Sequence, residues 1–299
     1  MTFDEMKAKI AAGHGFIAAL DQSGGSTPKA LSGYGIEPSE YSGDAQMFDL
    51  IHQMRSRIIQ SPAFSGDKVV GAILFERTMD GEVGGKPTVQ ALADKGVVPF
   101  LKIDKGLEDE ENGVQLMKPM PGLGDLLDRA KKLGVFGTKE RSVINAANDA
   151  GIAVLVAQQF EVAQQVLAHG LVPIIEPEVN IKSADRADSD RLLLAALGEE
   201  LDRLPGDEQV MLKLSIPAEA GLFTPLTQHP RVLKVVALSG GFSRDEACAE
   251  LAKNPGMIAS FSRALLNDLR AQMSDSDFDA ALGSAIDQIY TASVDKVAA

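Results

Sequence analysis

Apolar, strand-like runs alternate with helical segments along this chain of 299 residues. Strands that alternate with helices build a parallel sheet, and eight such units close into a barrel. We therefore predict an α/β fold, a (β/α)8 TIM barrel, with residues 1–299 forming a single domain. The predicted strands cover residues 16–21, 69–76, 97–104, 135–141, 172–178, 210–216, 235–241 and 257–262.

One further apolar run, residues 152–157, resembles a strand by composition. It lies in a stretch from Asn145 to His169 without proline, and the residues after it repeat apolar side chains at helical spacing. A ninth strand would also require an awkward crossover. We therefore predict one long helix here. For the C-terminal segment, the sequence is compatible with a helix over the barrel and with a mobile flap.

Four consecutive predicted strands carry charged residues where a buried strand should be apolar. Residues two apart on a strand share a face, so the charges within each strand point the same way. Unpaired buried charge is costly, so such residues are exposed, paired or functional. Active sites of barrel enzymes lie at the C-terminal ends of the strands, which is where these charges fall. The residues are Lys102 and Asp104, Lys139 and Arg141, Glu176 and Glu178, and Lys213, with Asp21 and Glu76 ending two earlier strands.

Lys213 is the strongest candidate for a nucleophile. Burial and nearby cations both favour the neutral form of an amine, which can attack a carbonyl and form a Schiff base. Glu176 and Glu178, on the preceding predicted strand, could transfer protons. Lys139 and Arg141 could position these glutamates and bind a substrate oxygen or phosphate. The alternatives are a lysine that snorkels from a strand end and a purely structural charge network.

A loop late in the chain suits an anion. Ser239, Gly240 and Gly241 precede a helix that begins near Ser243, and glycine lets the backbone approach an anion at a helix N-terminus. Arg263, after the last predicted strand, adds a fork of donors. The same residues are compatible with an ordinary turn.

A loop early in the chain could bind a second phosphate. Residues 21–26 offer the hydroxyls of Ser23 and Ser26 together with backbone amides, and Lys29 or Lys102 lies nearby. The alternative is an ordinary loop between a strand and a helix.

The composition is that of a soluble globular protein, with 45% hydrophobic and 24% charged residues. A net charge of −13 argues against a nucleic-acid surface, although a local cationic pocket remains compatible with it. The single cysteine, Cys248, excludes an internal disulfide, fits a reducing cytoplasmic compartment and is expected to be buried. We find no signal-peptide pattern and no apolar run near the ~20 residues of a membrane span. We expect no nucleic-acid or membrane partner.

The histidines, His14, His52, His169 and His229, show no metal-ligand spacing. Zinc-dependent aldol chemistry usually needs a histidine cluster. The segment GEVGGK at residues 81–86 lacks the lysine spacing of a phosphate-binding loop, and we interpret its glycines as a loop. We therefore predict no metal and no cofactor, with a covalent imine on Lys213 as the reactive group.

The motifs around these residues resemble the class I, Schiff-base fructose-bisphosphate aldolases in their short bacterial form. The similarity runs from AALDQSGGSTPKAL at residues 18–31 through FERTMDG, LKIDKG, GTKERS, LVPIIEPE and MLKLSI to LSGGFSRDEA and SFSRAL. It covers roughly residues 14–270. LVPIIEPE together with LKIDKG and LSGG is specific to that family rather than to barrels in general.

The resemblance implies a role for each candidate residue. Lys213 matches the Schiff-base lysine, and Glu176 matches the general acid/base. Asp21 matches the aspartate that holds the substrate hydroxyls and assists carbon–carbon cleavage, while Glu178 and Lys139 match groups that support imine formation. The implied binding residues are Arg141 for the substrate, Lys102, Ser23 and Ser26 for the C6 phosphate, and Ser239, Gly240, Ser260 and Arg263 for the C1 phosphate.

Three features depart from the longer enzymes of that family. The early loop reads DQS instead of DES, so Gln22 lacks a charge. The last strand reads SFSR instead of SYGR, so Ser262 replaces a glycine whose backbone amide binds phosphate. A C-terminal tyrosine is not evident, since Tyr290 lies nine residues before the end, and we do not carry over that tyrosine's role in proton transfer.

We expect a metal-independent aldolase that reversibly cleaves fructose 1,6-bisphosphate to dihydroxyacetone phosphate and glyceraldehyde 3-phosphate, in glycolysis or gluconeogenesis. One alternative is a transaldolase-like or single-phosphate ketose aldolase, which needs only one anion site. Another is a non-catalytic sugar-phosphate binding or scaffolding protein, which would need a missing chemical residue. The expected partners are small-molecule sugar phosphates, and the sequence is compatible with a homo-oligomer.

Overall fold

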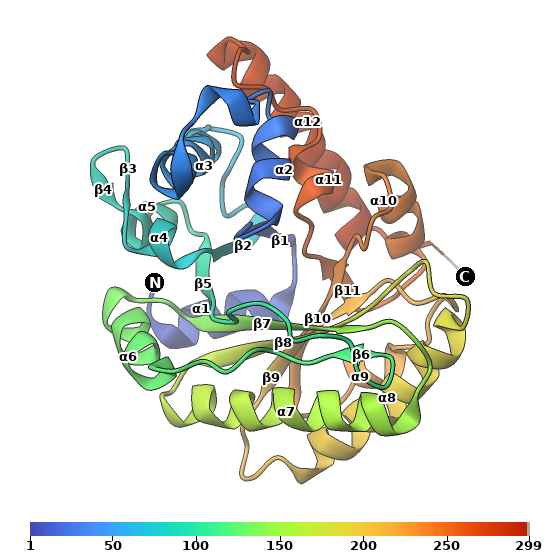
Figure 1. Ribbon diagram of the computed structural model, residues 1–299. Coiled ribbons are helices and arrows are strands. Elements are labelled where there is room, and N and C mark those ends of the chain that lie inside the picture. The colour runs from blue at the N-terminus through green and yellow to red at the C-terminus, as the bar shows by residue number, and fades with distance from the viewer. Residues whose placement is uncertain (298–299) are drawn as a thin grey trace.

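The computed structural model describes residues 1–297, and in it the predicted strands form one parallel sheet that closes into a TIM barrel (Figure 1). Neighbouring strands pair in chain order, and the last meets the first where the Ala19 amide donates to the Phe261 carbonyl at 3.1 Å. This confirms the predicted fold class. The barrel strands are β1 (Phe16–Leu20), β2 (Val69–Leu74), β5 (Val98–Lys102), β7 (Gly137–Ile144), β8 (Val172–Val179), β9 (Val210–Ser215), β10 (Val232–Leu238) and β11 (Met257–Ala259).

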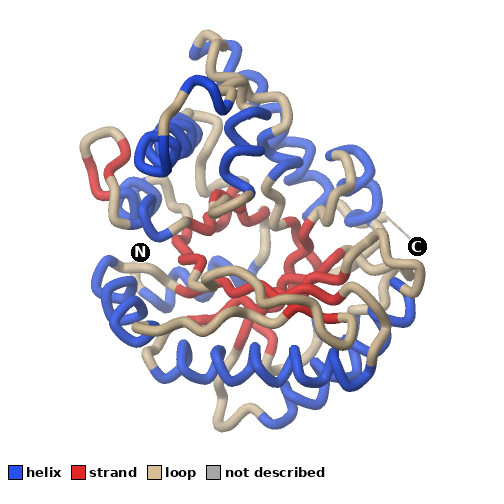
Figure 2. The backbone as a smooth tube through the Cα atoms, in the orientation of Figure 1, coloured by secondary structure: helices blue, strands red, loops and turns tan. Residues whose placement is uncertain are grey.

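Helices surround the strands, as the tube in Figure 2 shows. The predicted long helix is confirmed: α7 (Asp149–Ala168) begins where the Asn148 side chain accepts the Gly151 amide at 2.9 Å, and it packs along β7 and β8. The other longer helices are α1 (Phe3–Ala12), α2 (Ser26–Gly33), α3 (Gly43–Gln60), α5 (Thr88–Asp94), α6 (Leu123–Leu133), α8 (Arg186–Arg203), α10 (Arg244–Ala252) and α12 (Asp275–Val294). Short helices are α4 (Glu76–Met79), α9 (Thr224–Thr227) and α11 (Arg263–Leu266).

The alternating faces of the strands divide the apolar core into two parts. Side chains such as Ile17, Phe100 and Met211 fill the inside of the barrel, and Met6 and Ile10 of α1 pack against them. The outward side chains form a larger cluster between the strands and the surrounding helices. The inside is therefore apolar at the end covered by α1, and the charged positions of the strands lie toward the opposite end.

Three segments differ from, or add to, the sequence expectation. Residues 81–88 form a hairpin, β3 (Glu82–Val83) and β4 (Lys86–Pro87), whose turn places Gly84 and Gly85 at φ 59° and 77°. A short strand, β6 (Val114–Gln115), pairs antiparallel with β7. The C-terminal segment is a helix, α12, packed against α10, α11 and β11. Within residues 1–297, no helix is long and apolar enough to cross a membrane.

Candidate active site

A cavity of about 1170 Å³ opens at the C-terminal ends of the barrel strands. It is lined by side chains from widely separated parts of the chain, and these include nearly all of the residues singled out in the sequence. Gly241 lies beside the cavity and does not line it. The predicted residues that line it are Asp21, Ser23, Ser26, Lys29, Glu76, Lys102, Asp104, Lys139, Arg141, Glu176, Glu178, Lys213, Ser239, Gly240, Ser260 and Arg263.

Lys139 is the centre of the charge network at the floor of this cavity. It points inward from β7, and its side chain is only 3% exposed. Its Nζ lies 2.6 Å from Asp21 Oδ2, 3.0 Å from Glu176 Oε2 and 3.9 Å from Asp104 Oδ2. Burial opposes the charged form, but these carboxylates outweigh it and raise the pKa of Lys139 well above its usual value. Lys139 is therefore a permanent cation that three carboxylates share.

Lys213 reaches the same network from β9. Its buried Nζ lies 3.0 Å from Glu176 Oε1, so the Glu176 carboxylate bridges Lys213 and Lys139. Burial alone would raise the pKa of Glu176, but Lys139 and Lys213 lower it below its usual value. An ionised carboxylate next to a buried amine can accept the proton that the amine must lose before it attacks a carbonyl.

Asp21, the residue after β1, faces the network from the other side. Burial would raise the pKa of Asp21, yet Lys139, Lys213 and Lys102 hold it well below its usual value. The carboxyl group is thus ionised at neutral pH. An ionised carboxylate at the floor of the cavity can accept a proton from a substrate hydroxyl.

Two further ion pairs flank the floor. Arg141 pairs with Glu178 nearer the opening. Burial alone would lower the pKa of Arg141, but Glu178 and Glu176 outweigh it and raise that pKa above its usual value. Lys102 Nζ donates to the Asp104 carbonyl at 2.9 Å and pairs with the carboxylate of the same residue. Burial lowers the pKa of Lys102 in spite of Asp104.

The early loop folds into the start of α2. The Ser26 hydroxyl donates to the Ser23 carbonyl at 2.8 Å and accepts from the Ser23 amide at 3.0 Å. Gly24, Gly25 and Lys29 line the cavity beside them. The loop therefore faces the cavity as predicted, with the Ser26 hydroxyl hydrogen engaged by its own turn.

The late loop has a feature that points to a ligand. Ser260 lines the cavity, and its hydroxyl oxygen is buried without a hydrogen-bond partner among the described residues. Gly240 has φ 58°, and a Cβ there would lie 2.8 Å from Ile181, so the chain needs glycine at this position. Ser239 and Arg263 line the cavity next to these two residues. This combination suits an anion.

The helix N-terminus predicted to bind that anion has backbone donors that the chain's own side chains already satisfy. The Ser243 hydroxyl accepts the Glu246 amide at 3.3 Å, and the Glu246 carboxylate accepts the Ser243 amide at 2.9 Å. This capping box satisfies two backbone donors at the start of α10. The start of α10 does not line the cavity, so the donors on this side come from the loop itself.

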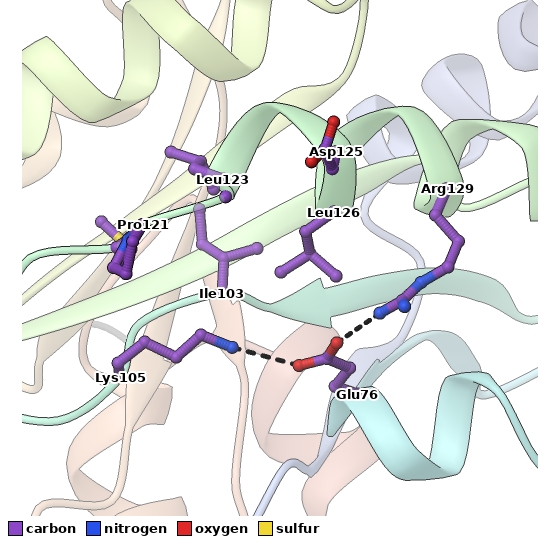
Figure 3. Close-up of a pocket in the computed structure, with 10 residues that line it drawn as sticks. Glu76, Ile103, Lys105, Pro121, Leu123, Asp125, Leu126 and Arg129 are labelled. Carbon is purple, nitrogen blue, oxygen red and sulfur yellow. Dashed lines mark hydrogen bonds and ion pairs between the residues drawn. The ribbon is translucent and has the colours of Figure 1, made fainter.

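Glu76, a predicted charge at a strand end, is tied to its neighbours. Figure 3 shows its carboxylate between Lys105 and Arg129 in a small pocket of about 180 Å³ that adjoins the main cavity. Lys105 Nζ lies 3.1 Å from Glu76 Oε2, and Arg129 pairs with the other oxygen. These contacts join the end of β2 to α6 and to the loop after β5.

Sequence reasoning missed three buried charged residues, Arg55, Glu140 and Asp190. Arg55 of α3 is 1% exposed and reaches the loop after β1, where it donates to the carbonyl of Gln22. Its signal was a charge on the apolar face that Ile51 and Ile58 define by helical spacing. Glu140, between Lys139 and Arg141, faces the opposite way and is fully buried, and burial raises its pKa well above the usual value.

Among residues 1–297, no group of three or more histidine, cysteine, aspartate or glutamate side chains is placed to hold a metal ion. Cys248 is a buried free thiol, and burial raises its pKa to about 11.

The chain was compared with known proteins. It is similar over 99% of its length to fructose-bisphosphate aldolase from Plasmodium falciparum, solved in complex with TRAP and an inhibitor, with a TM-score of 0.76, 22% identity and 96% of that chain covered. A protein of Corynebacterium glutamicum gives a TM-score of 0.55 at 14% identity, over 97% of this chain and 92% of that one. These similarities support the barrel fold.

The family comparison goes further than the fold. The model of glycolytic class I fructose-bisphosphate aldolases matches residues 3–190. The matched segment includes Asp21, Lys139 and Glu176, which form the floor of the cavity, and ends before Lys213. On this match, the chain belongs to the class I fructose-bisphosphate aldolase family.

Proposed function

We propose that this chain cleaves fructose 1,6-bisphosphate to dihydroxyacetone phosphate and glyceraldehyde 3-phosphate, and catalyses the reverse condensation. Class I aldolases are lyases that act on sugar phosphates through a lysine Schiff base without a metal. The observation that carries the proposal is the buried Lys213 amine 3.0 Å from Glu176 at the floor of a cavity. The proposal takes residues 1–299 as one aldolase domain acting in the cytoplasm, in glycolysis or gluconeogenesis.

The proposed reaction begins at Lys213. Glu176 accepts a proton from Lys213, and the neutral amine attacks the C2 carbonyl of the substrate. Glu176 then returns the proton to the leaving hydroxyl, so that water departs and a protonated imine remains. Asp21 then accepts the proton of the C4 hydroxyl as the C3–C4 bond breaks. The bonding electrons pass into an enamine on Lys213, and glyceraldehyde 3-phosphate leaves. The buried charge network then passes one proton to C3, so that Asp21 is ionised again. Hydrolysis of the imine releases dihydroxyacetone phosphate and restores the lysine.

The remaining residues are proposed to hold the substrate and the network. Lys139 keeps Asp21 and Glu176 ionised and fixed, because it contacts both. Arg141 and Glu178 contact each other closer to the opening, where Arg141 can orient the sugar hydroxyls and Glu178 is proposed to support imine formation. The proposed C1-phosphate residues are Ser239, Gly240, Ser260 and Arg263, with Gly241 beside them, and the proposed C6-phosphate residues are Ser23, Ser26 and Lys102.

A single-phosphate ketose aldolase is the second candidate. The observation that favours it is that the Ser26 hydroxyl and the Lys102 amine are both engaged by neighbouring groups of the chain. Comparing kcat/KM for fructose 1,6-bisphosphate and fructose 1-phosphate separates the two candidates. A bisphosphate enzyme should have the higher kcat/KM for fructose 1,6-bisphosphate. In such an enzyme, Lys29→Met should lower kcat/KM for fructose 1,6-bisphosphate and leave kcat/KM for fructose 1-phosphate unchanged. Equal kcat/KM values would favour the single-phosphate enzyme.

Borohydride trapping tests the imine. The protein is incubated with fructose 1,6-bisphosphate in EDTA, reduced with borohydride and mapped by mass spectrometry. We expect an adduct on Lys213, which Lys213→Met should abolish together with cleavage. Lys68→Met is the matched control, because Lys68 lies outside the cavity and pairs with Asp287 on the surface. Cleavage in EDTA without any adduct would refute the proposed mechanism.

A further inference from the structure

The two residues that depart from the longer aldolases contact each other. Gln22, after β1, donates from Nε2 to the Ser262 hydroxyl oxygen at 2.6 Å, although they are 240 residues apart in the chain. The same nitrogen donates to the Ala19 carbonyl at 3.1 Å. Gln22 and Ser262 both line the cavity. This contact therefore joins the two loops that carry the proposed phosphate sites.

Arg55 fixes the orientation of the Gln22 amide. Its Nη2 donates to the Gln22 carbonyl at 2.5 Å and to the Gln22 side-chain oxygen at 3.2 Å, while its Nη1 donates to Thr78 at 2.8 Å. A guanidinium group has donors and no acceptor, so the amide oxygen must face it. The amide nitrogen consequently faces Ser262. Arg55 is 1% exposed and Gln22 is 8% exposed, so water competes little for these bonds.

The direction of the hydrogen bond decides what Ser262 can do. Because Gln22 donates, Ser262 Oγ is the acceptor, and its own hydrogen remains free for another partner. Ser262 lines the cavity beside Arg263 and near Ser260, whose buried hydroxyl has no hydrogen-bond partner among residues 1–297. Free hydroxyl hydrogens next to a guanidinium group suit a phosphate oxygen.

We propose that the Ser262 hydroxyl is an additional donor to the substrate phosphate at the ends of β10 and β11, and that Gln22, held by Arg55, is the positioning residue that keeps its hydrogen available. This inference rests on the proposed function, which places a phosphate there. A carboxylate at position 22 would still accept from Arg55 but has no hydrogen to donate. Ser262 would then donate to that carboxylate and lose its hydrogen for the phosphate.

Dihydroxyacetone phosphate is the appropriate probe, because its single phosphate reports on this site alone. The measured quantity is the concentration that gives half-maximal borohydride trapping on Lys213. Ser262→Ala should raise it on the order of tenfold, the loss expected for one hydrogen bond to a charged group. Ser262→Thr keeps a hydroxyl and should stay near the wild-type value. Ser56→Ala, whose hydroxyl contacts Gln60 outside the cavity, is the matched control.

A double-mutant cycle tests the role of Gln22. Gln22→Glu should weaken trapping strongly in the wild-type background and less in the Ser262→Ala background, because the hydroxyl hydrogen is already gone there. If Gln22→Glu raises the half-maximal trapping concentration by the same factor in both backgrounds, the positioning role of Gln22 is wrong. If Ser262→Ala has the wild-type half-maximal trapping concentration, the donor role of Ser262 is wrong.

Inorganic phosphate binding, measured by calorimetry, separates this inference from the proposed function. If the wild type gives no Lys213 adduct but binds phosphate in a Ser262-dependent way, the aldolase proposal fails and the donor role stands. If the wild type traps dihydroxyacetone phosphate and Ser262→Ala does so equally well, the donor role fails alone. Absence of phosphate binding together with absence of an adduct would overturn both.

Discussion

Replacing Lys139 with methionine tests whether one ammonium group holds the floor of the cavity together. Lys139 lies 2.6 Å from Asp21 and 3.0 Å from Glu176, and its side chain is 3% exposed. Methionine keeps most of the length of the side chain and removes its charge. The carboxylates of Asp21 and Glu176 then stay buried, with Lys213 as a cation at 3.0 Å from Glu176.

The expected loss in the free energy of unfolding is large. Removing one partner of a buried ion pair costs about 3–5 kcal/mol, because the other charge is left buried and uncompensated. The pair between Lys68 and Asp287 is the matched control, since these side chains are 42% and 63% exposed. Exposed pairs contribute about 0–1 kcal/mol. Near neutral pH, Lys139→Met should therefore lose several kcal/mol while Lys68→Met stays close to the wild type.

The pH dependence distinguishes lost charge pairing from lost packing. In the wild type the pKa of Asp21 is lowered in the fold, so this group adds stability above the pKa of the unfolded chain, and the stability is lost as pH falls through the folded pKa. In Lys139→Met the strongest of these cations is gone, and burial is opposed only by Lys213 and Lys102, so the pKa of the Asp21 carboxyl should rise and its contribution to stability should shrink. The stability difference between the wild type and Lys139→Met should therefore grow as pH rises from acid toward neutral.

Urea unfolding followed by circular dichroism measures these free energies at several pH values. Adding Asp21→Asn to Lys139→Met should restore part of the loss, because it removes one of the carboxylates left without its cation. A loss of less than about 1 kcal/mol at neutral pH would refute the central role of Lys139. A loss of the same size at every pH would mean that packing, and not charge, is responsible.

Three other predictions each rest on a single structural observation. Burial raises the pKa of Glu140, so the free energy of unfolding should fall as pH rises above the ordinary glutamate pKa, by up to about 1.4 kcal/mol per pH unit. Urea unfolding at about pH 5 and pH 8 measures this slope, and Glu140→Gln should remove it. Cys248 is buried with a pKa of about 11, so the native protein should resist a thiol reagent at neutral pH until urea unfolds it, and rapid labelling would contradict the fold. Gly240→Ala forces a side chain at φ 58° against Ile181, so it should weaken trapping of dihydroxyacetone phosphate, and wild-type trapping would show that this turn can shift.

The barrel could be predicted because its information is local and periodic. The inward positions of β7 and β8 are two residues apart, so Lys139 shares a face with Arg141, as Glu176 does with Glu178. Period and strand order are enough to place these charges at one end of a parallel barrel. The capping box of Ser243 and Glu246 was also readable from its three-residue spacing, and it explains why the start of α10 is already satisfied.

The contacts between distant loops had no such signal. Gln22 and Ser262 each look like an isolated departure from a motif, and only the closure of β11 on β1 brings them together. Arg55 comes from a helix whose apolar face predicts burial but says nothing of which backbone carbonyl a guanidinium will meet. Such pairs depend on the stagger of strands around the barrel, which the alternation of strands and helices does not determine.

Depth along the strand sorts the charges into a floor and a rim. Two residues advance about 6.6 Å along a strand, so the second charge of each pair lies closer to the opening. The side chain of Lys139 is 3% exposed against 38% for Arg141, and Glu176 is 4% exposed against 21% for Glu178. The deeper pair contacts Lys213 and Asp21 in a medium where charges interact strongly, whereas the outer pair contacts itself next to solvent. The proposed imine chemistry thus belongs to the floor, and recognition of the substrate's oxygen atoms belongs to the rim.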